Sequence, residues 1–223
     1  TGSVTLLRPA EQIKKIGSSG RLEWGVETRL ATPDGDEAAP GAEGEITVRG
    51  PNVCAGYYKN PEETAKSLEA DGWLHTGDIA TMDEDGYATI VDRKKDMILT
   101  AGFNVCPAEL ERVICMHPAV ALAAIGSIPD EAKGELAKAY VMLKPGLSVT
   151  GSELIAHCRQ YLAAYKVPRA VQFVDAVPMT SSGKIMRRLL RDIAEGRALG
   201  DTTTLADPGV VAALKTQYED KES

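Results

Sequence analysis

The stretch "DRKKDMILTAGFNVCPAELE", Asp92 to Glu111, divides this sequence into two parts with different patterns. It opens with five consecutive charged residues, Asp92 to Asp96, which are too polar to be buried and too few to form a flexible linker. We therefore predict a hinge at residues 93–96, with a solvated surface turn as the alternative interpretation. The part before the charged run has the pattern of β-structure, and the part after it alternates strands and helices.

The upstream part, from Leu22 to Ile90, contains short β-rich runs such as "GEITVRG" and "YATIVD" between turn clusters such as "PDGD" and "DEDG". This pattern is typical of a small, mostly antiparallel sheet. One helix is expected within it, at "PEETAKSLEA", because Pro61 suits the first position of a helix. Residues 1–92 are therefore predicted to form a β-rich unit.

The downstream part begins with a helix at "PAELERVICMHP", where Leu110, Val113 and Ile114 recur at helical spacing and Pro118 marks the end. Strands are expected at "AVALAAIGSI", "AKAYVMLK" and "AVQFVDA", and helices at "GSELIAHCRQYLAAY", opening at Ser152, and at "KIMRRLLRDIAEG". Residues 97–199 thus form a small α/β unit, and residues 200–223 form a tail whose charged end frays. The predicted fold class of the whole chain is α/β (α+β).

The composition limits the classes of partner. The chain has 223 residues, 43% of them hydrophobic, with 25 Lys and Arg against 32 Asp and Glu, a formal net charge of −7. This balance argues against broad electrostatic attraction to nucleic acid or anionic lipid. No apolar run approaches the ~20 residues that span a bilayer, and no signal-peptide core is present, so we expect neither membrane insertion nor secretion.

Cysteine and histidine spacing gives little support for a metal site. The four cysteines show no CxxC spacing, which favours reduced thiols in a cytoplasmic protein. The three histidines lie far apart, without a second ligand at metal-site spacing. No metal ligand is therefore predicted within this chain.

Lys184 is the first candidate for a catalytic residue. It follows Gly183 in "TSSGKIMRR", on a loop of small residues just before an expected helix. A phosphate-binding P-loop is excluded, because that loop needs a glycine where Pro178 stands and a serine or threonine where Ile185 stands. Two readings remain, a plain turn or a positive charge that meets negative charge developing on a phosphoryl group.

Asp78 and Arg93 have a similar ambiguity. Gly77 and Asp78, in "WLHTGD", can place a carboxylate at a tight turn, where it accepts hydrogen bonds from two vicinal hydroxyls of a ribose. An aspartate that only stabilises its own turn has the same local sequence. Arg93 could hold sugar hydroxyls or be an exposed charge, so these residues taken singly leave both interpretations open.

The order of four segments points to a family. "GEITVRGPNVCAGYYKNPEET", "WLHTGDIA", "DRKKDMILTAGFNVCPAELE" and "PMTSSGKIMRRLLR" resemble, in this order, the C-terminal motifs of adenylate-forming enzymes, specifically the acyl-CoA synthetases (fatty-acid:CoA ligases). The resemblance extends to about Leu199. It implies that residues 1–92 are the last, β-rich subdomain of a large adenylation domain and that residues 97–199 are the small mobile C-terminal domain.

The resemblance also implies an activity in two steps. A carboxylic acid reacts with ATP and Mg2+ to give an acyl-adenylate and pyrophosphate, and the thiol of coenzyme A then displaces AMP. Asp78 is expected to bind the ribose hydroxyls of ATP with help from Arg93. Lys184 is expected to contact the substrate carboxylate and the α-phosphate, where it would stabilise charge in the adenylation transition state.

The second step involves other residues of the same motifs. In the family the small domain rotates between the steps, and Lys95 occupies the hinge position. The loop "LTAGFNV" then replaces Lys184, so that Gly102 and Phe103 line the channel for the pantetheine arm of coenzyme A. Some relatives carry lysines where this sequence has Leu99 and Ala101, so any role of those lysines does not transfer to this chain.

Several expectations concern segments that should precede Thr1 in the family pattern. They are the phosphate loop, the adenine-binding segment, the acidic ligand of Mg2+ and the acyl pocket. We therefore expect this chain to be a fragment that is inactive alone. The resemblance implies that the whole enzyme acts on a medium- or long-chain fatty acid. The sequence gives no indication of the oligomeric state.

Three alternatives remain open. Aryl-CoA ligases share the motifs. Adenylation domains that load a carrier protein typically resemble "QVKIRGxRIELGEIE" and "NGKVDR" at these places, and "DMILTAGFNVCPAELE" and "SSGKIMRR" lie nearer to the CoA ligases. A free-standing, non-catalytic partner module would have no need to keep functional residue types at Asp78, Arg93, Lys95, Gly102 and Lys184.

Overall fold

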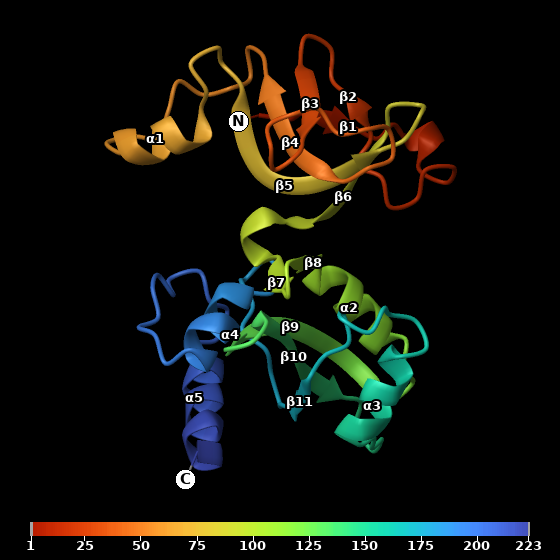
Figure 1. The fold of residues 1–223 in the computed structure, drawn as a ribbon, viewed down its shortest axis with the longest axis vertical. Helices are drawn as coiled ribbons and strands as arrows, with labels where there is room; N and C mark the ends of the chain where they lie inside the picture. Colours follow the sequence, from red (N-terminus) through yellow and green to blue (C-terminus); the bar gives the residue numbers. More distant parts are fainter. Residues whose placement is uncertain (1, 223) are drawn as a thin grey trace. The chain divides into compact units, whose positions relative to one another are not determined.

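The computed structural model describes residues 2–222, with side chains described up to Gln217. The chain divides into two compact units, residues 1–95 and residues 96–223 (Figure 1). Both units mix strands and helices, which confirms the predicted α/β (α+β) class. Within the described residues, no helix combines the length and the apolar character that a membrane crossing requires.

The first unit is built on an antiparallel four-stranded sheet in the order β3-β4-β5-β6. These strands are β3 (Glu27–Ala31), β4 (Gly44–Arg49), β5 (Leu74–Met82) and β6 (Ala88–Arg93). A small ladder of β1 (Thr5–Leu6) and β2 (Arg21–Leu22) and a 3-10 turn, Pro9–Glu11, precede the sheet. Its buried core consists of Leu30, Ile46, Val48 and Ala80.

The α-helix α1 (Pro61–Ser67) connects β4 to β5, at the predicted place but three residues shorter than the predicted segment. Pro61 occupies its first turn, and the side chain of Asn60 accepts a hydrogen bond from the N–H of Glu63 at 3.1 Å. This cap satisfies one of the amides that have no partner at a helix start. The helix ends at Ser67, and the backbone of the next residue, Leu68, is extended.

The second unit contains a five-stranded sheet in which β10 lies at the centre. Its strands are β7 (Ile98–Thr100), β8 (Phe103–Val105), β9 (Val120–Asp130), β10 (Gly134–Leu143) and β11 (Ala170–Phe173). Only the β10–β11 pair is parallel. The helices are α2 (Pro107–Cys115), α3 (Gly151–Cys158), α4 (Arg187–Ala194) and α5 (Gly209–Glu222) (Figure 1).

Strands β9 and β10 are buried on both faces. Ala139 of β10 packs in a core with α2 and α3, whereas its neighbour Tyr140 packs in a second core with α4 and α5. Since successive side chains of a strand point to opposite faces, a strand buried on both sides needs a continuous apolar run. This requirement explains the sequence "VALAAIG" of β9.

Three predicted helix boundaries are corrected. α3 begins at Gly151 and not at Ser152. Thr150 caps this helix start: its side chain accepts the N–H of Glu153, and the side chain of Glu153 accepts the N–H of Thr150. It ends at Cys158 because the following turn tightens, with the N–H of Tyr161 bonded to the carbonyl of Cys158 at 3.1 Å. α4 starts three residues after Lys184, at Arg187, because the residues before it form a hairpin.

The tail contains a helix that was not predicted from the sequence, whereas the predicted fraying concerns the charged end, whose side chains lie outside those described. Residues Gly209–Glu222 form α5, and Val211 and Leu214 are buried against Leu189 and Leu190 of α4. The apolar run "VVAAL" gives this helix a face that α4 covers. Burial of that face stabilises a segment that would be marginal as an isolated helix.

The α4–β9 contact yields a first prediction. Leu190 is fully buried, and a Cβ added to Gly126 of β9 would lie 3.0 Å from the Leu190 Cβ, so helix and strand approach closely at this point. Leu190→Ala is expected to reduce the free energy of unfolding by about 2–5 kcal/mol, because the cavity cannot collapse completely. Urea denaturation measures this value. Leu147→Ala, at a half-exposed position, serves as control, and an equal loss in both variants would contradict the prediction.

Candidate active site

Asp78 and Arg93 face each other on neighbouring strands. They are register partners of β5 and β6, and Arg93 Nε lies 3.5 Å from Asp78 Oδ1. Both side chains are accessible, with exposed fractions of 39% for Asp78 and 58% for Arg93. Such an exposed pair contributes little to stability. Its accessible oxygens and N–H groups are instead available to a ligand.

A cavity of about 560 Å³ adjoins this pair, and all its lining residues belong to the first unit. Four basic side chains and two carboxylates contribute to the lining. They are Lys66, Arg93, Lys94, Lys95, Glu45 and Glu63. The excess of positive charge favours an anionic ligand.

A buried carboxylate, Glu45, organises one wall of the cavity. Its Oε2 accepts a hydrogen bond from Lys94 Nζ at 2.8 Å and lies 3.1 Å from His75 Nδ1, and its Oε1 accepts the N–H of Gly77 at 3.1 Å. Burial acts to raise the pKa of Glu45, but the hydrogen bonds from Lys94 and His75 outweigh it and hold the pKa below its ordinary value. Glu45 is therefore ionised at neutral pH.

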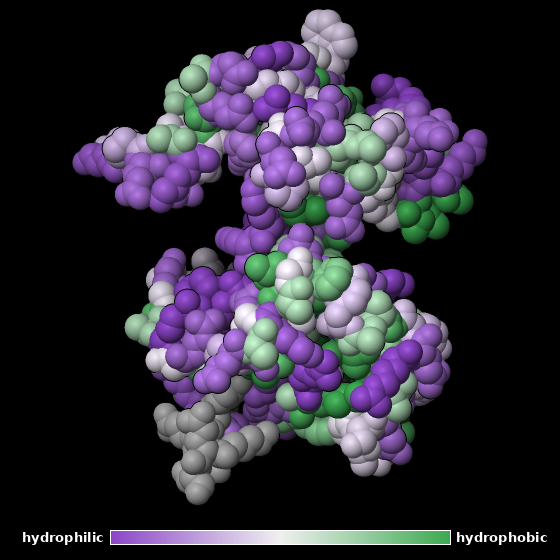
Figure 2. Space-filling view, in the orientation of Figure 1, coloured by the Kyte–Doolittle hydropathy of each residue, from purple (hydrophilic) through white to green (hydrophobic). Residues whose placement is uncertain are grey.

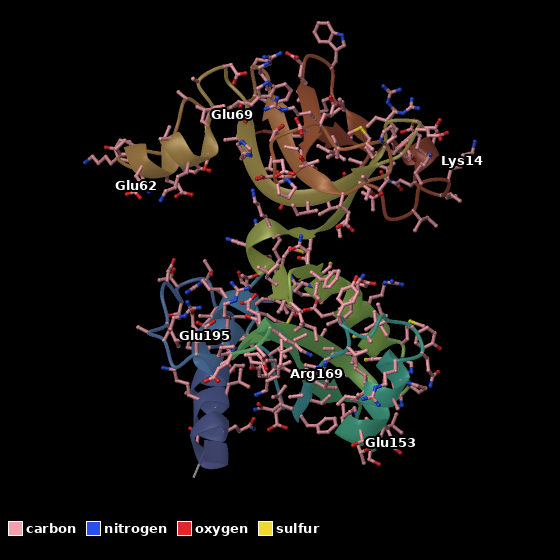
Figure 3. The ribbon with its side chains drawn as sticks, in the orientation of Figure 1. Lys14, Glu62, Glu69, Glu153, Arg169 and Glu195 are labelled. Carbon is pink, nitrogen blue, oxygen red and sulfur yellow. The ribbon has the colours of Figure 1, made fainter. Side chains whose placement is uncertain are left out.

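His75 links Glu45 to a second carboxylate. Its Nε2 lies 2.8 Å from Glu69 Oε1, so both ring nitrogens face acidic side chains. Glu69 lies between α1 and β5 (Figure 3). It also accepts two hydrogen bonds from Arg29. Neither Glu45 nor His75 was predicted from the sequence as a site residue. The signal that could have revealed Glu45 is a carboxylate beside the β-forming residues Ile46, Thr47 and Val48 of the strand "GEITVRG".

Lys184 lies in the second unit, on a tight hairpin between β11 and α4. The N–H of Thr180 donates to the carbonyl of Lys184 at 2.9 Å, and the N–H of Lys184 donates to Thr180 Oγ1 at 3.1 Å. Gly183, with φ +79°, supplies the left-handed conformation that the turn requires. The backbone of Lys184 is thus fixed while its side chain is exposed.

Gly102 and Phe103 belong to the β7–β8 hairpin. Ala101 and Gly102 form its turn with φ values of +50° and +82°, both left-handed, as a type I′ turn requires. The ring of Phe103 stacks on that of Tyr165, with 4.7 Å between ring centroids and 29° between planes. Both rings are accessible, with residue exposures of 55% and 39%. Tyr165 was not predicted, because no local pattern pairs it with Phe103.

The structure brings Asp78 and Arg93 together, and Lys95 lines the adjoining cavity. Gly102, Phe103 and Lys184 belong to the other unit. In the part of the chain that the structure describes, no group of three or more His, Cys, Asp or Glu side chains could hold a metal ion. Figure 2 shows that hydrophilic residues cover much of both units on the face in view.

Two family models match this chain. Residues 1–58 match the model described as AMP-binding enzyme, and residues 109–184 match the AMP-binding enzyme C-terminal domain. The chain therefore belongs to the AMP-binding family of adenylate-forming enzymes. Within that family it is similar to the C-terminal portion of acyl-CoA synthetases, which confirms the resemblance seen in the sequence.

Curated relatives of this chain are CoA ligases. A long-chain-fatty-acid–CoA ligase of Yersinia pestis is 50% identical over 176 residues, which are 79% of this chain and 31% of the relative. A feruloyl-CoA synthase of an Amycolatopsis species is 46% identical over 188 residues, 84% of this chain and 38% of the relative. The chain spans about a third of the length of these relatives.

Solved structures of adenylate-forming enzymes share the fold. The ATP-bound RpMatB-BxBclM chimera B3 has a TM-score of 0.76 and 35% identity, covering 82% of this chain and 37% of the chimera. The o-succinylbenzoate CoA synthetase MenE of Bacillus subtilis, in complex with its acyl-adenylate intermediate, has a TM-score of 0.76 and 34% identity. That match covers 86% of this chain and 39% of MenE.

Proposed function

We propose that this chain is the C-terminal part of an ATP-dependent, AMP-forming acyl-CoA ligase. Its residues 1–92 would be the last subdomain of the adenylation domain, 93–96 the hinge, 97–199 the mobile domain and 200–223 a tail. The observation that carries the proposal is the accessible Asp78–Arg93 pair beside a cavity with a basic lining. The identity of about half the aligned positions to CoA ligases supports it.

The proposed first step is adenylation, in which a carboxylate oxygen attacks the α-phosphorus of ATP and pyrophosphate leaves. The carboxylate of Asp78 accepts hydrogen bonds from the two ribose hydroxyls, and Arg93 donates to the same sugar. The ammonium of Lys184 stabilises the negative charge that develops between carboxylate and α-phosphate. The rigid hairpin around Thr180 supports this role, because a fixed backbone limits where the lysine can reach.

The proposed second step forms the thioester. The thiol of coenzyme A attacks the acyl carbonyl, the carbon–sulfur bond forms, and AMP leaves. The mobile domain rotates at Lys95 and brings the β7–β8 hairpin to the site. Gly102, which has no side chain, allows the pantetheine arm to approach the backbone. The accessible rings of Phe103 and Tyr165 offer a stacking surface for the adenine of coenzyme A.

For the substrate we propose a medium- or long-chain fatty acid, because the relative with 50% identity is a long-chain-fatty-acid–CoA ligase. An aryl acid is the second candidate, because a relative with 46% identity is a feruloyl-CoA synthase. ATP, coenzyme A and Mg2+ are the proposed cofactors, with Mg2+ entering alongside ATP. The proposed location is the cytoplasm, where both nucleotides are available.

The test of this function uses the complete gene product that contains this chain. Carboxylate-dependent ATP–pyrophosphate exchange and acyl-CoA formation are measured with octanoate, hexadecanoate and ferulate. Both reactions are expected, with the fatty acids preferred. Preference for ferulate would favour the aryl-CoA ligase. Exchange without thioester formation would favour a carrier-protein-loading enzyme, and failure of both reactions would favour a non-catalytic module.

Asp78→Ala in the same protein is expected to raise the KM for ATP by about 10–100-fold, since a hydrogen bond to a charged group contributes about 1.5–3 kcal/mol. The KM for the fatty acid should change much less, because Asp78 contacts only the ribose in the proposed site. Steady-state kinetics at saturating coenzyme A measure both constants. Asp34→Ala, at an exposed turn of the same unit, is the control. An unchanged KM for ATP would remove Asp78 from the nucleotide site.

A further inference from the structure

Asp78 lies in a bulge of β5. Between two paired positions of the β4–β5 ladder, β4 advances two residues while β5 advances four. The pairs on either side of this irregularity are Thr47 with His75 and Glu45 with Ile79. A bulge of this kind turns side chains in a new direction and takes backbone groups out of the ladder. Those groups need other partners, because an unsatisfied backbone group away from water is costly.

Side chains supply these partners. The hydroxyl of Thr76 donates to the carbonyl of Ile46 at 2.8 Å and accepts the N–H of Asp78 at 3.1 Å. The N–H of Gly77 donates to Glu45 Oε1 at 3.1 Å. Each residue of the bulge is therefore bonded through a side chain, and two of these bonds lead to β4. Glu45 and Thr76 together fix the backbone from which Asp78 projects.

Glu45 is an unusual residue for the inside of a sheet. Its side chain is only 7% exposed, its strand has a neighbour on each side, and a buried carboxylate is costly unless its oxygens are hydrogen-bonded. Lys94 and His75 contact Oε2, and Glu69 contacts the other ring nitrogen of His75. These contacts hold the carboxylate in place and leave Oε1 directed at the N–H of Gly77.

We propose that Glu45 and Thr76 are positioning residues of the nucleotide site, which hold the bulge so that Asp78 presents its carboxylate to the two ribose hydroxyls. Neither residue contacts the nucleotide, and each acts through Asp78. Two neighbouring hydroxyls require both oxygens of one carboxylate at hydrogen-bonding distance, so a small rotation of the backbone at Asp78 loses one of the bonds. The inference rests on the ribose contact proposed above for Asp78.

The 223-residue chain without nucleotide tests whether Glu45 holds the bulge. With glycine labelled with 15N, NMR measures the exchange rate of the Gly77 amide hydrogen with solvent. Glu45→Leu is expected to raise this rate by about tenfold or more, because leucine offers no acceptor for the N–H. Glu43→Leu removes an exposed carboxylate just before β4 and should leave the rate unchanged. An unchanged rate in Glu45→Leu would overturn the inference.

The affinity for ATP tests whether the bulge positions Asp78. Titration calorimetry on the complete gene product, with Mg2+ but without fatty acid or coenzyme A, gives the Kd for ATP. Glu45→Leu and Thr76→Val are each expected to raise this Kd by about 5–50-fold, a loss no greater than that of Asp78→Ala. Valine has nearly the shape of threonine, so Thr76→Val carries the test if Glu45→Leu does not fold.

A double-mutant cycle shows whether the two residues act through Asp78. In the Asp78→Ala background, Glu45→Leu and Thr76→Val should each change the Kd for ATP by less than about twofold, because the residue that they position is already gone. Losses that add to that of Asp78→Ala would show that Glu45 and Thr76 act apart from Asp78, and would overturn the inference.

A nucleotide without ribose hydroxyls separates positioning from general damage to the fold. The Kd for 2′,3′-dideoxy-ATP should agree within about twofold between the wild type and Thr76→Val, since the contact at issue is absent from both. Equal weakening of ATP and 2′,3′-dideoxy-ATP would point to structural damage alone and contradict the inference. Thr81→Val makes the same substitution on β5 beyond the bulge and should leave the Kd for ATP unchanged.

The outcomes separate this inference from the proposed function. A higher Kd for ATP in Asp78→Ala, with no change in Glu45→Leu and Thr76→Val, would overturn the inference and leave the proposed function intact. An unchanged Kd in all three variants would overturn both the inference and the ribose contact of Asp78. The expected Kd pattern in a protein that forms no acyl-CoA would support the inference and overturn the proposed ligase activity.

Discussion

Lys184→Ala in the complete ligase is expected to lower fatty-acid-dependent ATP–pyrophosphate exchange by about 10²–10³-fold. Removal of one preorganised group that stabilises transition-state charge typically has an effect of this size. The loss should appear in kcat more than in the KM for ATP, because the proposed contact strengthens as charge develops. Lys184 is exposed on a surface hairpin, so the substitution should leave the fold intact.

The second half-reaction serves as the internal comparison. When acyl-adenylate is supplied, Lys184→Ala should form the thioester at nearly the wild-type rate, because the lysine acts only in the first step. Lys144→Ala, an exposed lysine that follows β10, is the matched control for removal of one charge. Comparable losses in both half-reactions would remove Lys184 from its assigned role.

Lys95→Pro is expected to uncouple the two half-reactions. Proline fixes its own φ near −65° and also restricts the residue before it, here Lys94 in the 3-10 turn. Because the backbone at residue 95 is then less free to rotate, ATP–pyrophosphate exchange should persist while thioester formation falls. The expected fall is roughly a hundredfold, since misplacing a reacting group has an effect of this size. Single-turnover assays of each half-reaction measure the two rates separately.

Lys95→Ala separates the backbone effect from loss of the side chain. Alanine retains the torsional freedom of lysine at this position, so both half-reactions should stay coupled in that variant. If Lys95→Pro also kept both half-reactions at normal rates, the assignment of the hinge to residues 93–96 would be wrong.

The parts of the fold that could be predicted are those decided by residues adjacent in the sequence. Pro61 marks the start of α1, and the long apolar run of β9 predicts a buried strand. The tail helix α5 could not be predicted in this way, since its stability depends on burial of Val211 and Leu214 against α4. Contact with α4, which no short stretch of the tail sequence reveals, decides whether this segment forms a helix.

The candidate active site, like the fold, was predictable only where neighbouring residues decide it. The motifs identified Asp78 and Arg93, but their pairing depends on the register of β5 and β6, which shifts between Ile79 and Ala80. A shift of one residue would turn one of the two side chains to the opposite face of the sheet. The bond between Glu45 and Lys94 spans 49 positions of sequence and follows only from the folded sheet.

A segment of the tail, at Leu205 and Ala206, pairs with the hairpin that carries Lys184. Leu205 bridges Thr180, and the N–H of Ala206 donates to the carbonyl of Met179 at 2.9 Å. The C-terminal-domain family model ends its match at residue 184, so Leu205 and Ala206, the tail side of this contact, lie outside the matched region. Under the role proposed for Lys184, a substitution at Leu205 or Ala206 would shift this lysine and slow adenylation while every proposed active-site residue stayed unchanged.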